Sequence, residues 1–323
     1  IVVMMYILTS YSVATESLDC SAIKSVAEFK EVIKKNPDAE YLSFSGSRNV
    51  EDYWLAQAKN LKKLAGIDLS NTRITDNGIK HLSGMKQLEI LDISRTKVTD
   101  KCLLTVGKFK SLFYLNLNRT KITDKGISYL SECNLSELSD LILSETEITD
   151  KGIEALSKFK ELGVLSLAGL KITDKGVKCL CTVEELNVLS LSYTNISSQS
   201  LLYIKKLEHL GFLYLSNTDI CGAEESLKPL VEMKELRKLV LNETRISNDD
   251  LVVIGKIQSL RKLELANTKV TIDGIWRMSN LKKLIWLNLF KTNIKHESIR
   301  QLEKKYPDLT VMTEDVSGIG DFQ

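Results

Sequence analysis

The sequence predicts an α/β solenoid, in which short strands and short helices alternate and each strand–helix unit stacks on the next. The main observation is a repeat, LxxLxLSxTxITDxG, that recurs about every 24 residues along most of the chain. A period of this length is typical of solenoids, whose stacked units share one continuous core. We therefore expect one elongated domain, although 323 residues would ordinarily suggest one large or two smaller domains.

The apolar spacing changes within each unit, and this change predicts the two elements. Ile67 and Leu69 lie two residues apart, which places both on the same face of a strand. From Ile79 onward the spacing becomes three, which is typical of a short amphipathic helix. Thr75 or Asp76 is positioned to cap the first turn of that helix. A helix this short depends on packing against its neighbours.

One position of the repeat carries a threonine in most units. The series consists of Thr72, Thr96, Thr120, Thr146, Thr194, Thr218, Thr244, Thr268 and Thr292. Longer steps of 26 residues lead to Thr146 and Thr244, and Leu170 takes this position once. Backbone groups that face the core after the strand need hydrogen-bond partners, which a threonine hydroxyl can supply. We expect a buried ladder of hydroxyls along the stack, with a local change in hydrogen bonding at Leu170.

Several segments resemble the leucine-rich repeat family. They include LDLSNTRITDNGIKHL, LNLNRTKITDKGISYL, LILSETEITDKGIEAL and LSLAGLKITDKGVKCL, and the resemblance covers residues 39–312. Many family members carry asparagine or cysteine where this chain carries threonine. The ITDxG element resembles bacterial repeats and the repeats attached to F-box adaptors. The resemblance implies a right-handed horseshoe, with a concave parallel sheet and convex short helices, that binds other proteins and is not an enzyme.

The ends of the chain depart from the repeat, as the ends of a solenoid must if the core is to be covered. We assign residues 17–38 to an N-terminal capping helix, 39–312 to about 10–11 repeat coils, and 313–323 to a C-terminal tail. A helix is expected over Val26–Ile33, a first strand over Tyr41–Phe44, and a last strand near Leu309–Met312.

Residues 1–16 form a hydrophobic, signal-like segment. The stretch IVVMMYIL is too short to span a bilayer as a helix, and Ser12-Val13-Ala14 resembles a signal-peptide cleavage site. The basic region of a signal is missing, so the stretch could equally end a longer hydrophobic segment or pack on the first repeat. The chain is therefore secreted or at the cell surface if Ile1–Ala14 is a signal remnant, and cytoplasmic otherwise. It contacts a membrane only if this segment is an anchor.

Composition and motifs argue against several functional classes. The net charge is +2, with 44 basic and 42 acidic residues, which does not indicate a nucleic-acid partner. The six cysteines lack metal-ligand spacing and matching phases, so we expect reduced thiols, no metal and no cofactor. The three histidines fall in distant repeats, and no phosphate loop or nucleophile elbow is present, so no catalytic residue is assigned. The recurring aspartates Asp76, Asp100, Asp124, Asp150 and Asp174 are interpreted as structural caps.

The outward positions of the strands are the candidate binding site, because the core does not need them. Same-phase residues in successive coils are neighbours, about 4.8 Å apart. The predicted partner-binding residues are Tyr114, Ile142, Val164, Val188, Phe212, Tyr214, Val240, Lys238, Lys262 and Trp286. Most of these form an apolar strip of the kind that soluble monomers rarely expose without use. Good strand-forming propensity alone is the alternative explanation.

The charges on this face are expected to orient a partner. Asp68 and Asp92 would give an acidic end, and Lys238 and Lys262 a basic end. The sequence thus predicts a monomeric protein–protein interaction scaffold that binds a protein on the concave sheet. The alternatives are the substrate-recognition arm of a ubiquitin-ligase adaptor, a secreted bacterial effector, and an enzyme site hidden in the groove. Residues 18–38 do not resemble an F-box, and no nucleophile, base or metal set clusters in the repeats.

Overall fold

The computed structural model describes residues 17–221 and 226–314. The chain divides into two compact units, Ile1–Leu165 and Ser166–Gln323, which are described separately. The expected leader over residues 1–16 lies outside the described residues, as does the tail from 315 onward. Within the described ranges, no helix is both long and apolar enough to cross a membrane.

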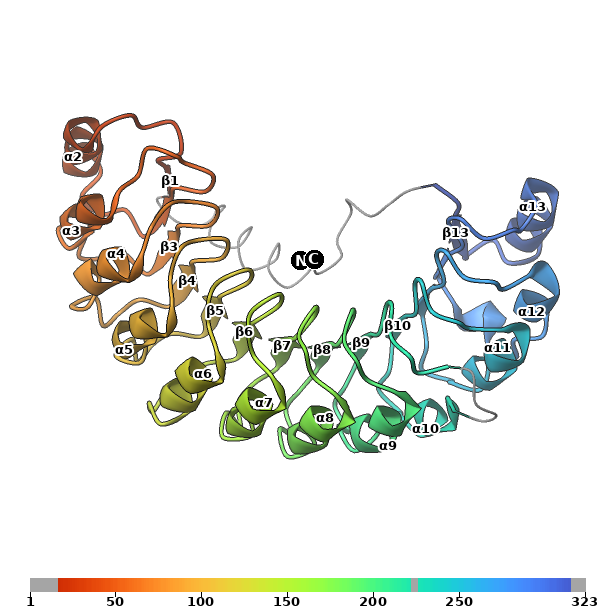
Figure 1. The fold of residues 1–323 in the computed structure, drawn as a ribbon. Helices are drawn as coiled ribbons and strands as arrows, with labels where there is room; N and C mark the ends of the chain where they lie inside the picture. The colour runs from red at the N-terminus through yellow and green to blue at the C-terminus, as the bar shows by residue number, and fades with distance from the viewer. Residues whose placement is uncertain (1–16, 222–225, 315–323) are drawn as a thin grey trace. The chain divides into compact units, whose positions relative to one another are not determined.

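In the first unit, short parallel strands alternate with short helices. The strands are β1 (Ser17–Asp19), β2 (Tyr41–Ser43), β3 (Gly66–Asp68), β4 (Ile90–Asp92), β5 (Tyr114–Asn116) and β6 (Asp140–Ile142), and β7 (Val164–Ser166) lies at the boundary between the units. The helices are α2 (Val26–Lys35), η1 (Asp52–Trp54), α3 (Leu55–Ala58), α4 (Asp76–His81), η2 (Asp100–Cys102), α5 (Leu103–Val106), α6 (Asp124–Ser131) and α7 (Asp150–Leu156). Within this unit the strands lie on one side and the helices on the other (Figure 1).

The second unit repeats this arrangement. Its strands are β8 (Val188–Ser190), β9 (Phe212–Tyr214), β10 (Lys238–Val240), β11 (Lys262–Glu264), β12 (Trp286–Asn288) and β13 (Thr310–Met312). Its helices are α8 (Asp174–Leu180), η3 (Ser198–Ser200), α9 (Leu201–Ile204), α10 (Lys228–Val231), α11 (Asn248–Ile254), α12 (Ile272–Trp276), η4 (Leu281–Lys283) and α13 (His296–Lys305). Each unit is thus an α/β solenoid, as the sequence predicts.

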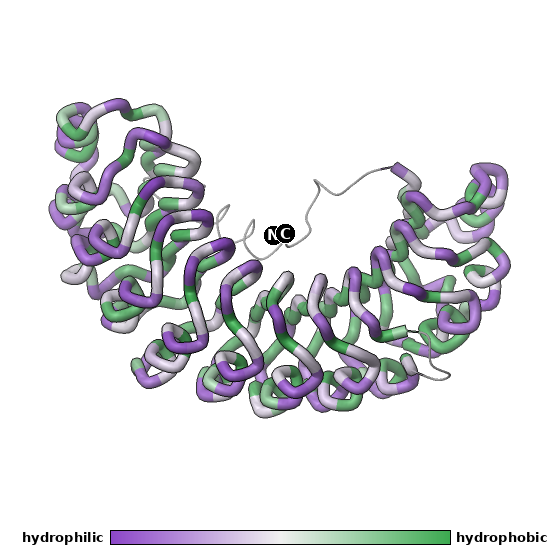
Figure 2. Tube along the Cα trace, viewed as in Figure 1, coloured by the Kyte–Doolittle hydropathy of each residue, from purple (hydrophilic) through white to green (hydrophobic). Residues whose placement is uncertain are grey.

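Within each unit, successive strands pair in parallel, from β1 to β6 in the first unit and from β8 to β13 in the second, and residues at the same position of the repeat pair with each other. In the first unit Tyr114 pairs with Asp140, and Leu115 with Leu141. The central residue of each strand from β2 to β12, such as Leu115, is fully buried. The residues on either side of it face the opposite surface of the sheet. Figure 2 shows hydrophobic segments alternating with hydrophilic ones along the chain, because part of each coil faces the core and part faces solvent.

The structure contains the helix α2 that the sequence predicts before the first repeat strand. Ser25 caps this helix, since its side chain accepts a hydrogen bond from the backbone N–H of Glu28. The buried ring of Phe29 packs edge-on against Phe44, with ring centroids 5.1 Å apart, and stacks on Trp54. Strand β1, which pairs with β2, was not predicted, because its three residues carry no part of the repeat pattern.

The expected ladder of threonine hydroxyls between coils is wrong. Each hydroxyl is used within its own coil, as when Thr96 Oγ1 donates to the carbonyl oxygen of Ile93 at 2.6 Å. The bond closes the turn that follows the strand. In this turn the residue before each threonine adopts a left-handed conformation, with φ of 55° at Arg95. At Leu170 no hydroxyl is available, and the Leu170 N–H donates to the carbonyl oxygen of Leu167 at 3.3 Å.

A ladder does connect the coils, but its acceptors are aspartates. Asp124 Oδ1 accepts from the backbone N–H groups of Thr149 and Gly152 at 2.7 and 3.0 Å, and its Oδ2 accepts from the Thr149 hydroxyl at 2.6 Å. The equivalent bonds join Asp76 to Thr99 in the same unit. The repeat aspartates that this network includes are therefore structural, as predicted, although they cap the helix of the following coil.

This ladder explains the ITDxG motif. The threonine caps the helix of its own coil. The aspartate accepts hydrogen bonds from the threonine of the next coil, and the glycine of that next coil leaves room for the aspartate side chain. A Cβ atom placed on Gly152 would lie only 2.6 Å from Asp124 Oδ1. Alanine there would push away the carboxylate that caps the helix, so glycine is required by contact rather than by backbone conformation.

Candidate protein-binding surface

The predicted binding residues lie on the outward face of the sheet, but most of them are more shielded than the sequence suggests. Tyr114 on β5 and Ile142 on β6 are 5% and 8% exposed, and Val164 on β7 is also buried. Side chains on strands this close together pack against one another sideways. The first unit therefore does not expose an apolar strip to solvent. The outward side chains of its sheet are packed closely against one another.

In the second unit the structure brings the predicted residues together in two adjacent columns. Register pairing aligns the first outward position of successive strands as Val188, Phe212, Lys238, Lys262 and Trp286. It aligns the second outward position as Ser190, Tyr214, Val240, Glu264 and Asn288. Val188, Tyr214 and Val240 are buried, whereas Phe212 and Trp286 are partly exposed and Lys262 is exposed. The accessible part of this face is thus two aromatic rings and one cation.

The basic end that the sequence suggests is only half present. The Lys238 Nζ lies 2.8 Å from Glu264 Oε1, and both side chains are nearly buried. The same ammonium group lies 5.0 Å from the ring centroid of Tyr214, within the range of a cation–π contact. Lys238 is therefore neutralised by its neighbour on β11. Glu264 was not predicted as the partner of Lys238, although it occupies the same outward position of its strand as Asp68 and Asp92.

The acidic end exists in the first unit. Asp68 and Asp92 are directly paired across β3 and β4. Burial, and then the charge of Asp68, raises the pKa of Asp92 to about 7, against hydrogen bonds from Ser94 and Asn116 that lower it. The Asn116 amide donates to Asp92 Oδ2 at 2.8 Å. Burial also raises the pKa of Asp68, an effect that hydrogen bonds from Ser70 oppose.

Further titratable groups extend this acidic region, which we define as Tyr41, Asp68, Asp92, Tyr114 and Asp140. Burial raises the pKa of Asp140 to about 6. Burial and the neighbouring carboxylates raise the pKa values of both tyrosines. Tyr41 and Asp140 were not among the predicted site residues, although the repeat phase puts them in the same outward column as Tyr114. Their common phase is the sequence signal that points to them.

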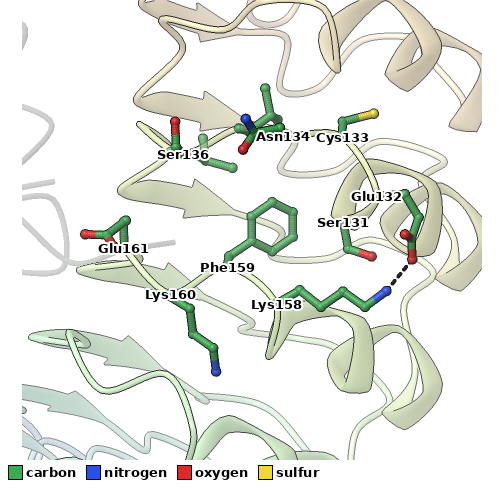
Figure 3. Close-up of a pocket in the computed structure, with 11 residues that line it drawn as sticks. Ser131, Glu132, Cys133, Asn134, Ser136, Lys158, Phe159, Lys160 and Glu161 are labelled. Carbon is green, nitrogen blue, oxygen red and sulfur yellow. Dashed lines mark hydrogen bonds and ion pairs between the residues drawn. The ribbon is translucent and has the colours of Figure 1, made fainter.

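A separate hollow of about 340 Å³ lies on the first unit where a 26-residue step lengthens the coil. It is lined by residues 131–136 and 158–161 with Leu138. Figure 3 shows the Phe159 ring among these residues and the ion pair between Glu132 and Lys158 to one side. No histidine lines this hollow, and its lining includes two serines and one cysteine, Ser131, Ser136 and Cys133. Among the described residues, no group of three or more His, Cys, Asp and Glu side chains is placed to hold a metal.

Comparison with known proteins identifies the family. The family model described as "Leucine-rich repeat region" matches residues 23–273. The chain therefore belongs to the leucine-rich repeat family, as its repeat segments suggest. No curated protein matches the sequence.

Solved structures share the fold at low sequence identity. The internalin InlF of Listeria monocytogenes is 18% identical with a TM-score of 0.64, and the match covers 94% of this chain and 87% of that one. The mouse RP105/MD-1 complex contains a chain that is 19% identical with a TM-score of 0.60, over 87% of this chain and 47% of that one. A structure described as a TDR receptor is 18% identical with a TM-score of 0.55, over 92% and 52% of the two chains. At these identities the likeness concerns the fold alone.

Proposed function

We propose that this protein binds a partner protein through the outward face of its sheet and is not an enzyme. The observation that carries the proposal is the arrangement of Phe212 on β9, Lys262 on β11 and Trp286 on β12 in one outward column of the second unit. Partly exposed aromatic rings beside a cation resemble the anchors of a protein interface.

The buried members of the predicted site have a different role in this proposal. Tyr214 and Val240 are buried in the column next to the exposed rings, and Lys238 forms an ion pair with Glu264. Because these side chains are already packed in place, less conformational entropy is lost when a partner binds. Membership of the leucine-rich repeat family, and the likeness to a chain of the mouse RP105/MD-1 complex, support the same interpretation.

The test is to change the exposed residues and leave the buried ones intact. We expect the double variant Phe212→Ser/Trp286→Ser to lose its partner in affinity capture followed by mass spectrometry. The matched control is Leu202→Ser, which removes an exposed apolar side chain on α9. Circular dichroism checks that the fold is intact. An unchanged partner from the folded double variant would refute the site.

The identity of the captured partner decides between the alternatives. Subunits of a ubiquitin ligase among the captured proteins would favour the adaptor arm, and host proteins would favour the effector. A screen for hydrolase and transferase activity tests the enzyme alternative. We expect the purified chain to be a monomer, which light scattering measures directly.

A further inference from the structure

The first unit carries two neighbouring carboxylates, one buried and one partly buried, that have no cation beside them among the described residues. Asp68 and Asp92 lie side by side on β3 and β4, and Asp92 is 4% exposed. No lysine or arginine of the described ranges forms an ion pair with either group; the hydrogen bonds that Asp68 and Asp92 accept come from serine and asparagine. Buried charges in folded proteins are ordinarily paired, because an unpaired charge loses its hydration without compensation.

Tyr41 adds a polar group that also lacks a partner. Its side chain is more than nine-tenths buried, and no hydrogen bond joins its hydroxyl to a described residue. Its ring leans from β2 across Gly66 on β3, since a Cβ atom on Gly66 would lie 2.8 Å from Tyr41 Cε2. The charges of both aspartates act on the Tyr41 hydroxyl. The Tyr41 ring therefore lies over β3, the strand that carries Asp68.

The second unit shows how this sheet face satisfies a buried carboxylate. Glu264 occupies the outward phase that Asp68 and Asp92 occupy in the first unit. Lys238 on the adjacent strand neutralises it and stands over the ring of Tyr214. The first unit has the carboxylates and the tyrosine but no lysine at the equivalent strand positions, because the first outward position of β3 is Gly66 and that of β4 is an isoleucine.

We propose that the partner protein supplies the missing cation, and that a lysine or arginine side chain of the partner binds against Asp68, Asp92 and the Tyr41 hydroxyl. This inference rests on the proposed function and specifies the chemistry of the partner: a basic segment lying along the face of the first unit. Asp68 is only partly covered, so a long side chain can reach it from solvent. The Tyr41 ring offers the incoming cation the same kind of aromatic contact that Tyr214 offers Lys238.

The experiment is a selection of random twelve-residue peptides displayed on phage, with the full chain as bait. We expect the selected peptides to be enriched in lysine and arginine. A synthetic peptide from this pool should bind the double variant Asp68→Asn/Asp92→Asn at least tenfold more weakly than it binds the wild type. Replacing its basic residue with norleucine should cause a similar loss. Asp249→Asn, which changes an exposed carboxylate of the second unit, is the matched control and should bind normally.

The outcomes separate this inference from the proposed function. Peptides without basic enrichment, or basic peptides whose affinity is unchanged in the double variant, would overturn the cation site alone. A wild-type chain that selects no peptide and captures no protein would overturn both. Asparagine is nearly isosteric with aspartate, and circular dichroism verifies that the variant is folded before affinities are compared.

Discussion

The aspartate ladder allows a quantitative prediction at Asp124. In Asp124→Ala, three donors at the start of α7 lose their acceptor: the N–H and the hydroxyl of Thr149, and the N–H of Gly152. Losing one helix cap typically costs about 1 kcal/mol, and hydrogen bonds to charged groups contribute about 1.5–3 kcal/mol each. These bonds are only partly buried, so water replaces some of what is lost. We expect the free energy of unfolding to fall by about 2–4 kcal/mol.

The chain itself provides the matched control. Asn248 occupies the ladder position in the second unit, where its Oδ1 accepts from the N–H of Thr271 and its Nδ2 donates to the Thr271 hydroxyl, both at 2.9 Å. The hydroxyl simply changes from donor to acceptor. Asp124→Asn should therefore preserve the connection and cost less than about 1 kcal/mol.

The assay is urea unfolding followed by circular dichroism, with hydrogen exchange at Thr149 and Gly152 as a local readout. Hydrogen exchange is needed because solenoids can open coil by coil, so a single transition need not report every coil. Protection of these two amides should drop in Asp124→Ala and persist in Asp124→Asn. If Asp124→Ala unfolds at the wild-type urea concentration, or if the two variants are equally destabilised, the ladder is not what stabilises the stack.

Three further predictions concern buried polar groups. Thr120→Val removes the hydroxyl that donates to the Leu117 carbonyl oxygen at 2.6 Å, and urea unfolding should show a loss of about 1–2 kcal/mol; no loss would contradict a role in closing the turn. Lys238→Met leaves Glu264 buried without its cation, so thermal unfolding should reveal a cost of about 3 kcal/mol, and an unchanged midpoint would mean that the pair contributes nothing. Asp92 has a folded-state pKa of about 7 against an ordinary value of 3.8, so its neutral form favours the folded state. That contribution is complete below pH 3.8 and is lost as the pH rises through 7; stability measured from pH 4 to 8 should therefore fall less steeply in Asp92→Asn, and parallel curves would contradict the shift.

The repeat determines which residues form the strands, the helices and the core. Period-two spacing around Leu115 and period-three spacing after Ile79 are local properties, so they can be identified without knowing where the neighbouring coils lie. The outward phases follow from the same alternation, which is why the sequence locates the sheet face and its residues in both units. The helix α2 is likewise predicted from its own amphipathic pattern.

Hydrogen-bond partners and exposure were decided by the tertiary structure. The Thr96 hydroxyl and the Asp76 carboxylate both have the chemistry for a ladder, but only the distance between stacked coils shows that the aspartate reaches the next coil while the threonine bonds to its own. Stacking likewise pairs Lys238 with Glu264, whereas no lysine or arginine within residues 17–221 and 226–314 forms an ion pair with Asp68 or Asp92. Periodicity determines which face of the coil each side chain occupies. The spacing and register of adjacent coils determine which groups the side chain contacts and how far it is exposed to solvent.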